Sequence, residues 1–172
     1  MTTPTLLLLK GPMGVGKSTF AKALGKRTAW CVTDKDCISD VLVGHLEAYA
    51  SLSYDILFAF TEDLLGQGFN VIVDSPLRTE LGYLRAVRLA EKYSASLKVL
   101  ELHCSNKGVW RNRLESREFR AAQLIQTWAE FEMYWETAKT EFDYPVNHSH
   151  LLIDTSLALS DNLETVKRWL NI

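Results

Sequence analysis

Short apolar runs alternate along this chain with longer stretches in which apolar residues recur every three or four positions. The runs lie at residues 5–9, 29–33, 69–73, 97–104 and 151–153. Runs of this length are typical of strands that are buried on both faces of a parallel sheet. The spacing in the longer stretches is that of amphipathic helices. The pattern therefore predicts five strands that alternate with helices.

The predicted helices follow these runs in chain order. They span residues 19–27, 38–49, 54–65, 81–93, 109–120, 121–142 and 162–170. Strands that alternate with helices in this way indicate a three-layer α/β/α fold, in which a five-stranded parallel sheet is covered on both faces. Because ligands of such sheets bind outside the carboxyl ends of the strands, the residues that follow each strand are candidates for a functional site.

Composition and charge fit a single domain over residues 1–172. Hydrophobic residues make up 47% of the chain and charged residues 23%, which gives no indication of disorder. The net charge of −2 argues against a general nucleic-acid or membrane-surface binder, although a local basic patch stays open. No apolar stretch approaches the roughly 20 residues of a membrane span, and no secretory signal is visible, so we expect a cytoplasmic protein.

The loop after the first predicted strand carries the most specific motif of the chain. Its residues are Gly11, Pro12, Met13, Gly14, Val15, Gly16, Lys17, Ser18 and Thr19. They match G-x-x-x-x-G-K-[ST], the phosphate-binding loop called Walker A, and the flanking strand and helix favour it over a chance glycine-rich turn. Backbone N–H groups of such a loop converge on phosphates at a helix N-terminus. We predict that all nine residues bind nucleotide, that Lys17 reaches the β- and γ-phosphates and that Ser18 holds Mg²⁺.

Four aspartates follow predicted strands and are candidates for chemistry. Asp36, just past the second strand, is placed to accept the proton of a hydroxyl that attacks the γ-phosphate. Asp34 and Asp40 are alternatives for this role, and all three are also suited to capping the following helix. Asp74 ends the third strand as a Walker B acid does, so we predict that it helps to order Mg²⁺ or contacts the substrate. Its alternative role is in a turn.

Arginines are concentrated after the fourth predicted strand. They are Arg111, Arg113, Arg117 and Arg120. Arg113 and Arg117 are four positions apart, which places them on one face of the predicted helix. Because guanidinium groups pair well with phosphate oxygens, we predict a lid at roughly residues 111–127 in which these two arginines stabilise the transferring phosphoryl group, with Arg120 as the next candidate. The alternative is a solvated helix face with Glu–Arg pairs.

The segments that carry these residues make the chain resemble the small P-loop kinases of the predicted ATP-dependent kinase group. They read GPMGVGKST, WCVTDKDCISD, VIVDSPL and RNRLESR. This group is similar to chloramphenicol phosphotransferase, zeta toxin and the kinase half of polynucleotide kinase. The resemblance implies ATP as the phosphate donor, Asp36 as the base and Asp40 as the second aspartate of a pair. In the polynucleotide kinase-like branch an arginine follows the base three positions later, where this chain has Ser39, which argues against a polynucleotide end as substrate.

Other nucleotide-binding classes match less well. A GTPase requires N-K-x-D for guanine, but Val109 stands where the aspartate belongs in the stretch 106–109. The stretch Asp74-Ser75-Pro76-Leu77 also lacks the glycine of a GTPase switch turn. Motors, helicases and AAA+ ring subunits normally have longer chains.

The sequence therefore predicts an ATP-dependent phosphotransferase that moves the γ-phosphate to a hydroxyl of a small molecule. Two alternatives stay open: a polynucleotide or nucleotide-sugar kinase, and a nucleotide-dependent switch or binding module that phosphorylates no acceptor. We expect ATP and a small hydroxyl-bearing acceptor as partners and no membrane. Tyr49, Tyr54 and Phe58 are candidate acceptor contacts, while the identity of the acceptor and the oligomeric state are not predicted.

Overall fold

A computed structural model describes residues 3–172 of the chain. Its strands are β1 (Thr5–Lys10), β2 (Cys31–Asp34), β3 (Val71–Asp74), β4 (Ser96–His103) and β5 (Ser149–Asp154). Its helices are α1 (Lys17–Thr28), α2 (Lys35–Leu42), α3 (Tyr49–Gly66), α4 (Glu80–Lys92), α5 (Lys107–Ser116), α6 (Trp128–Ala138), the 3₁₀ helix η1 (Lys139–Phe142) and α7 (Leu159–Leu170). Each strand overlaps one of the predicted apolar runs.

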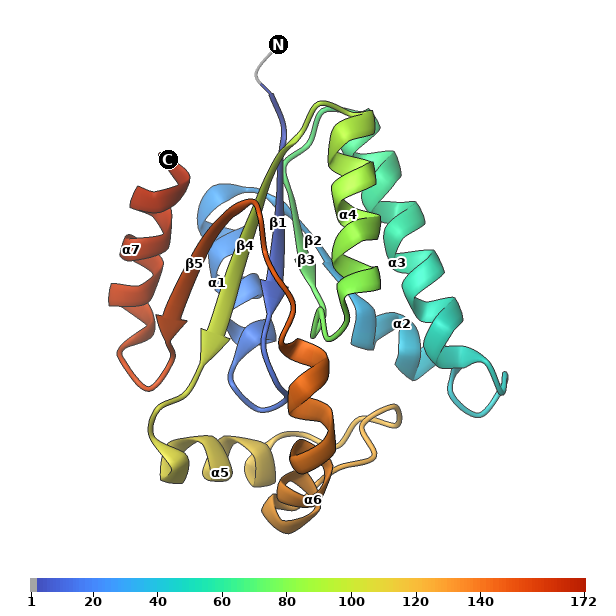
Figure 1. The fold of residues 1–172 in the computed structure, drawn as a ribbon, viewed down its shortest axis with the longest axis vertical. Helices are drawn as coiled ribbons and strands as arrows, with labels where there is room; N and C mark the ends of the chain where they lie inside the picture. The colour runs from blue at the N-terminus through green and yellow to red at the C-terminus, as the bar shows by residue number, and fades with distance from the viewer. Residues whose placement is uncertain (1–2) are drawn as a thin grey trace.

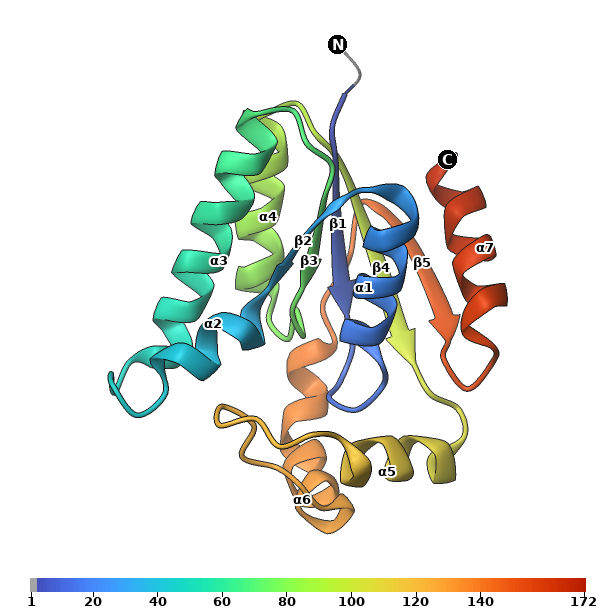
Figure 2. The ribbon, with the colours of Figure 1, turned by 180° about the vertical axis from the view of Figure 1, so that it is seen from behind.

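The five strands form one parallel sheet in the order β2-β3-β1-β4-β5. Helices α1 and α7 cover one face of the sheet, and α3 and α4 cover the other (Figure 1, Figure 2). After β1 the chain builds β2 and β3 on one side and then crosses to β4 on the other. The loop after β1 therefore lies at the switch in strand order, which is where sheets of this kind bind ligands.

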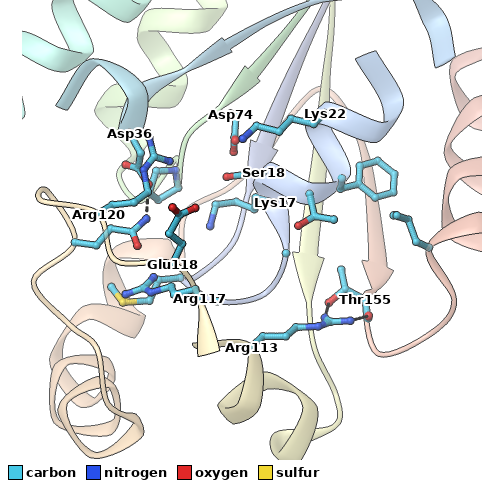
Figure 3. Close-up of a pocket in the computed structure, with 18 of the residues that line it drawn as sticks. Lys17, Ser18, Lys22, Asp36, Asp74, Arg113, Arg117, Glu118, Arg120 and Thr155 are labelled. Atoms are coloured by element: carbon cyan, nitrogen blue, oxygen red, sulfur yellow. Dashed lines mark hydrogen bonds between the residues drawn. The ribbon is translucent and has the colours of Figure 1, made fainter. Parts of the chain in front are cut away.

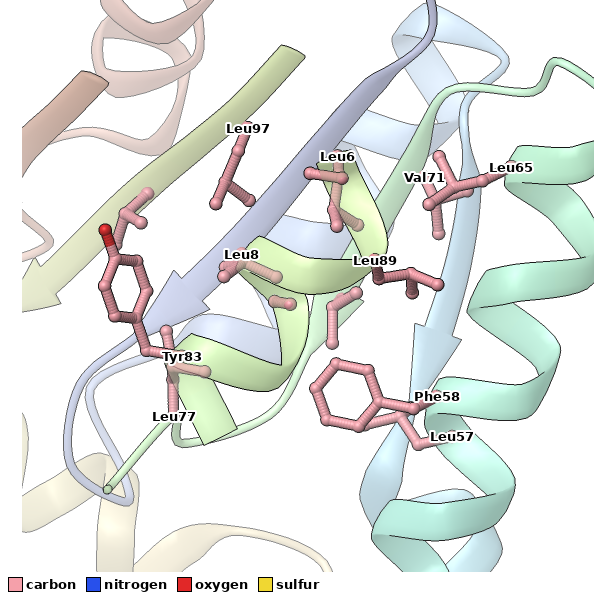
Figure 4. Packing of buried hydrophobic residues seen from close by; sticks show 14 residues of the cluster. Leu6, Leu8, Leu57, Phe58, Leu65, Val71, Leu77, Tyr83, Leu89 and Leu97 are labelled. Carbon is pink, nitrogen blue, oxygen red and sulfur yellow. The ribbon is translucent and has the colours of Figure 1, made fainter. Parts of the chain in front are cut away.

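The unbroken apolar run of β1 reflects its place between two helical layers. Leu6 and Leu8 belong to the cluster formed with α3 and α4, part of which is drawn in Figure 4, whereas Leu7 and Leu9 belong to the cluster formed with α1 and α7. All four side chains are completely buried, since successive side chains of a strand point to opposite faces. Packing on both faces thus fixes the strand from which the loop starts.

The predicted helix 109–120 is observed as α5, but it ends too early for the prediction to hold in full. The helix stops at Ser116, and Arg117 adopts an extended conformation with φ −67° and ψ 148°. Residues 117–127 contain no helix and pass over the carboxyl end of the sheet as an irregular segment. We refer to residues 117–127 as the covering segment.

The predicted helix 121–142 is wrong in its first part, because α6 begins only at Trp128. Thr127 and Glu130 form a capping box at this point: the Thr127 side chain accepts the N–H of Glu130, and the Glu130 carboxylate accepts the N–H of Thr127 at 2.9 Å. This local cap satisfies donors that a continuing helix would otherwise satisfy, so the helix starts there despite the helical spacing that precedes it.

The break predicted between helices 38–49 and 54–65 also lies elsewhere. α2 ends at Leu42, and Gly44 follows with φ +84°, a conformation that favours glycine. Ser53, predicted in the break, lies inside α3, where its hydroxyl donates to the Tyr49 carbonyl at 2.6 Å. Such back-bonding lets serine remain in a helix.

One expectation from composition can be compared with the fold. None of the helices formed by residues 3–172 combines the length and the apolar character needed to cross a lipid bilayer. The cysteines of this part of the chain, Cys31, Cys37 and Cys104, are all free thiols. They therefore place no covalent constraint on the fold, which depends on packing of the two apolar clusters.

We expect Gly25→Ala in α1 to destabilise the fold, although alanine favours helices. A Cβ atom at this position would lie 2.6 Å from Val32 Cγ2 and 3.2 Å from the carbonyl oxygen of Trp30. Overpacking of this kind costs about 1–3 kcal/mol, which exceeds the roughly 1 kcal/mol that alanine adds in helix propensity. Urea denaturation should therefore show a lower midpoint.

Gly82→Ala in α4 is the matched control for this substitution. A Cβ atom there would meet its nearest neighbour only at 3.8 Å, so the variant should gain about 0.4–1 kcal/mol in the free energy of unfolding. If Gly25→Ala instead kept or raised the midpoint, the close packing of α1 against β2 would be wrong.

Candidate active site

A cavity of about 540 Å³ opens at the carboxyl end of the sheet. Its floor is formed by part of the phosphate-binding loop with the start of α1, and its walls come from the start of α2, the end of β3, the end of α5 with the covering segment, and the residues after β5. Figure 3 shows Lys17 in the middle, Asp36 on one side, and Arg113 with Thr155 on the other. The cavity thus joins residues from five separate parts of the chain around one phosphate-binding loop.

Three glycines of the loop, Gly11, Gly14 and Gly16, have positive φ, and at two of them a Cβ atom would also lie too close to its neighbours. Gly11 has φ +142°, and a Cβ atom there would lie 2.3 Å from the carbonyl oxygen of Leu102 in β4. Gly14 has φ +78°, and a Cβ atom there would lie 3.2 Å from the Trp110 ring of α5. Trp110 also donates from Nε1 to the Met13 carbonyl at 2.8 Å. Helix α5 therefore packs directly against the loop and holds its backbone.

Lys17 is buried at the start of α1 and points back at the loop. Its Nζ donates to the carbonyl oxygens of Gly11 at 2.8 Å and Pro12 at 2.7 Å. Burial lowers the pKa of Lys17 to about 8, although the nearby charges of Asp74 and Asp36 act to raise it. Because a neighbouring anion favours the protonated form, a triphosphate on the loop would restore the full positive charge.

Ser18 and Asp74 form a pair suited to a hard divalent cation. Asp74 is 4% exposed, and its Oδ2 has no hydrogen-bond partner among residues 3–172. Burial raises the pKa of Asp74, while a hydrogen bond from Ser18 and the charge of Lys17 act to lower it. No group of three or more His, Cys, Asp or Glu side chains in the described residues could hold a metal ion alone. The pair fits Mg²⁺, which takes one or two protein oxygens together with phosphates and water.

The structure gives Asp34 and Asp36 different partners. Asp34 caps α2, because its Oδ1 accepts the backbone N–H groups of Asp36 at 2.8 Å and Cys37 at 3.2 Å. The Asp36 carboxylate pairs instead with Lys35 Nζ at 3.0 Å and accepts from Gln123 Nε2 at 3.2 Å. Burial acts to raise the pKa of Asp36, but the Lys35 charge and these hydrogen bonds outweigh it and lower the pKa below its ordinary value. Asp36 is therefore ionised at neutral pH.

Asp40 anchors the covering segment. Its Oδ2 accepts from Arg120 Nε at 2.6 Å, and its Oδ1 accepts the backbone N–H of Ala122 at 3.0 Å. Arg120 also lies 3.8 Å from an oxygen of Asp34. These contacts hold the covering segment against α2, so both Asp34 and Asp40 have structural partners that Asp36 lacks.

The predicted placement of Arg113 and Arg117 on one helical face is wrong, because Arg117 lies beyond the end of α5. Its Nη2 donates to the Ile125 carbonyl within the covering segment. Arg113 remains in α5. It donates to Oγ1 of Thr155 at 3.1 Å and to the Thr155 carbonyl at 2.8 Å, and Thr155 is the residue that follows β5. Arg111 is exposed and pairs with Glu115, which matches the solvated alternative. Arg113 and Arg117 thus line the cavity from different sides.

Three residues of the site had no motif in the sequence: Lys35, Gln123 and Thr155. Gln123 lies in a stretch that was predicted as helix, and its contact with Asp36 joins residues that are 87 positions apart. Thr155 follows β5, so the rule that strand ends build the site could have found it. None of the candidate acceptor contacts lines the cavity, and their role in acceptor binding stays a prediction. They are Tyr49, Tyr54 and Phe58.

Comparison with known families places the chain. A family model described as AAA domain matches residues 6–132, and the chain belongs to this family. The match begins in β1 and ends in α6, so it includes the phosphate-binding loop, Asp36 and Asp74. Chain length had argued against an AAA+ ring subunit, and the match concerns the type of domain rather than assembly into rings.

A curated relative refines the class. A shikimate kinase from Streptomyces coelicolor is 30% identical over 137 residues, which are 68% of this chain and 80% of the relative. The predicted class of small P-loop kinase is therefore confirmed. The finer likeness to chloramphenicol phosphotransferase, zeta toxin and polynucleotide kinase rests on the motif segments.

Solved kinase structures share the fold over nearly the whole chain. A putative kinase from Chloroflexus aurantiacus aligns with a TM-score of 0.77 and 18% identity, covering 97% of this chain and 98% of its own. A sugar kinase from Janibacter sp. gives 0.70 and 14%, covering 98% and 95%. A gluconokinase from Sinorhizobium meliloti gives 0.64 and 15%, covering 99% and 94%. At identities this low the structural alignments show the fold alone. They confirm the predicted α/β/α class.

The lowered pKa of Lys17 predicts that nucleotide binding weakens in alkaline solution. In the free protein Lys17 loses its proton as the pH rises through about 8, whereas a triphosphate is already ionised there. Binding above that pH must then include the uptake of a proton. The Kd for ATP, measured by isothermal titration calorimetry, should therefore rise about tenfold between roughly pH 7 and pH 9.

The control for this prediction is Lys17→Met, which has no ammonium to titrate. It should bind ATP weakly and with little dependence on pH over the same range. A wild-type Kd that stayed constant would show that Lys17 keeps its proton in the free protein.

Proposed function

We propose that the protein is an ATP-dependent phosphotransferase that moves the γ-phosphate of ATP to a hydroxyl of a small molecule. The observation that carries the proposal is the ionised Asp36 carboxylate on the wall of the cavity whose floor is the phosphate-binding loop. Transfer to a hydroxyl requires a proton acceptor beside the phosphates. The relationship to a shikimate kinase supports an acceptor of small size.

The residues of the cavity divide the work of phosphoryl transfer. Lys17 and the N–H groups of α1, whose N-cap Gly16 offers no side-chain cap, hold the phosphates. Ser18 and Asp74 would hold Mg²⁺, which supplies charge neutralisation on the phosphate oxygens. Asp36 accepts the proton of the acceptor hydroxyl, whose oxygen bonds to the γ-phosphorus as the bond from that phosphorus to the ADP oxygen breaks. Positioning and charge neutralisation supply most of the acceleration.

We infer that the nucleotide base lies on the Thr155 side of the cavity and the acceptor on the Asp36 side. Two exposed apolar side chains that follow Thr155 in the chain line the cavity: Leu157 and Leu159. An apolar surface of this kind suits a flat base, whereas the Asp36 side is lined by polar groups that suit a hydroxylated acceptor. Arg113, held on Thr155, then belongs to the nucleotide side rather than to the γ-phosphate.

The predicted lid at residues 111–127 corresponds to the end of α5 together with the covering segment. The covering segment lines the cavity with Arg117, Glu118, Arg120 and Gln123. The charge of Arg117 is close enough to lower the pKa of Lys17, which supports Arg117 as the guanidinium that acts on the transferring phosphoryl group. Arg120, paired with Asp40, serves to hold the covering segment in place.

The two alternatives, a polynucleotide kinase and a nucleotide-dependent switch, can be distinguished from a small-molecule kinase by experiment. Ser39, at the position of the arginine in polynucleotide kinase-like enzymes, is fully buried, and its hydroxyl donates to Ser53 Oγ at 2.9 Å. This position therefore offers no group to a nucleic acid, and an assay on 5′-hydroxyl oligonucleotides should give no phosphorylated product. A nucleotide-dependent switch would instead bind a protein partner with different affinity in the presence and absence of ATP.

A cytoplasmic location and a single domain over residues 1–172 stay predictions.

Asp36→Asn is expected to lower kcat about 10²- to 10⁴-fold, because an amide cannot take the hydroxyl proton. The Kd for ATP should change little, since the loop and Lys17 are intact. ADP release, followed against a library of nucleosides, sugars, antibiotics and cofactor precursors, identifies an accepted substrate and measures kcat. Asp63→Asn, on the exposed side of α3, is the control. Wild-type turnover by Asp36→Asn would remove Asp36 as the base.

Arg113→Ala and Arg117→Ala should show different kinetic defects. The first should raise the KM for ATP with little change in kcat, because Arg113 lies on the nucleotide side. The second should lower kcat about 10²- to 10³-fold, as expected when a group that stabilises the transition state is removed. Arg111→Ala, which removes only an exposed pair with Glu115, is the control. The same defect in both variants would contradict their assignment to separate sides.

A further inference from the structure

The side-chain amide of Gln123 is only half satisfied. Its Nε2 donates to Asp36 Oδ2 at 3.2 Å, but its Oε1 is buried and has no hydrogen-bond partner among residues 3–172. Rotating the amide would bring Oε1 against the ionised Asp36 carboxylate, so the contact with Asp36 settles which atom is nitrogen. A buried acceptor without a donor is costly, and this one belongs to a residue that lines the cavity.

The backbone around Gln123 is held in place by Asp40 of α2. The two oxygens of Asp40 bind Arg120 Nε and the N–H of Ala122, the residues before Gln123 in the chain. The N–H of Gln123 itself donates to the Arg120 carbonyl at 2.9 Å. The position of the unsatisfied oxygen is therefore set by the fold, because α2 carries both Asp36 and the carboxylate that fixes the covering segment.

We propose that Gln123 selects the acceptor: Nε2 orients Asp36, and Oε1 accepts a hydrogen bond from a hydroxyl or amine on the carbon next to the reacting hydroxyl. The acceptor is then a vicinal diol or an amino alcohol. This inference rests on the proposed function and names the substrate class of the same site. In the proposed contact, the substituent next to the hydroxyl that donates to Asp36 supplies the donor that Oε1 lacks, since Oε1 and Nε2 share one amide carbon.

The chemistry of Oε1 also says which acceptors are disfavoured. An alcohol without a second donor leaves Oε1 unpaired, and sites built to pair a hydroxyl reject analogues that lack it. A carboxylate on the neighbouring carbon would face Oε1 with another acceptor and would lie beside the ionised Asp36. Simple alcohols and 2-hydroxy acids should therefore be poorer acceptors than vicinal diols.

The first experiment measures binding without transfer. Thermal shifts of the wild-type protein, saturated with a non-hydrolysable ATP analogue, are compared for glucose and 2-deoxyglucose, ribose and 2-deoxyribose, glycerol and propane-1,3-diol, and glucosamine. At least one vicinal diol or amino alcohol should raise Tm more than its deoxy counterpart does. If none of these probes shifts Tm, or if the deoxy compounds shift it equally, the inferred substrate class is wrong.

The second experiment measures ADP release with the preferred probe and its deoxy counterpart. Gln123→Met keeps the side-chain size but removes both polar atoms. It should lower kcat/KM for the preferred probe about 10- to 100-fold more than for the deoxy compound, so that discrimination is lost. The lost contact with Asp36 affects both compounds equally and shifts the acid limb of the pH profile upward for both. Gln126→Met, an exposed residue of the covering segment outside the cavity, should change neither value.

The outcomes separate the inference from the proposed function. Equal loss of kcat/KM for both compounds in Gln123→Met would show that Gln123 only orients Asp36, which overturns its role in selection. If no probe is phosphorylated but the thermal shifts still favour the vicinal diol, and Gln123→Met abolishes that preference, the inference about Gln123 stands and the phosphotransferase proposal falls.

Discussion

Burial of the Lys17 ammonium is the constraint on which the rest of the site depends. Removing an ammonium from water costs several kcal/mol, and the carbonyl oxygens of Gly11 and Pro12 with the carboxylates of Asp74 and Asp36 offset only part of it, since the pKa of Lys17 still lies well below its ordinary value. A polyanion on the loop would offset the remainder. Because the same carboxylates are proposed to hold Mg²⁺ and to take the proton, phosphate binding and proton transfer are electrostatically coupled.

The short helix α2 organises the Asp36 side of the cavity, because three similar carboxylates at this helix have three different sets of partners. Asp34 caps the helix, Asp40 anchors the covering segment through Arg120, and Asp36 is left facing the cavity. These contacts depend on one another. The Asp34 cap positions the first turn of α2, which carries Asp36, and the contact of Asp40 with Arg120 brings Gln123 of the covering segment to Asp36. The polar wall of the cavity is therefore assembled from one helix and one irregular segment that is far away in the chain.

Most of the fold was predictable because its determinants are local. Burial of a strand on both faces requires consecutive apolar residues, so the run Leu6–Leu9 identified the central strand and similar runs identified the other four. The phosphate-binding loop was equally recognisable, since backbone with positive φ requires glycine at positions such as Gly11 and Gly14. Helix bounds were less predictable at α6, because the cap at Thr127 starts this helix inside a longer stretch of helical spacing.

The sequence by itself determined the sheet and the phosphate-binding loop, whereas only the tertiary structure decided which side chains surround the loop. The position after the second strand favoured Asp36, but the partners that separate it from Asp34 and Asp40 are visible only in the structure. Arg113 and Arg117 share a spacing but face different sides, since α5 ends between them. Gln123 gains its place only through a contact across 87 positions of the chain. Contacts of this kind arise from the packing of distant segments, which short-range periodicity does not encode.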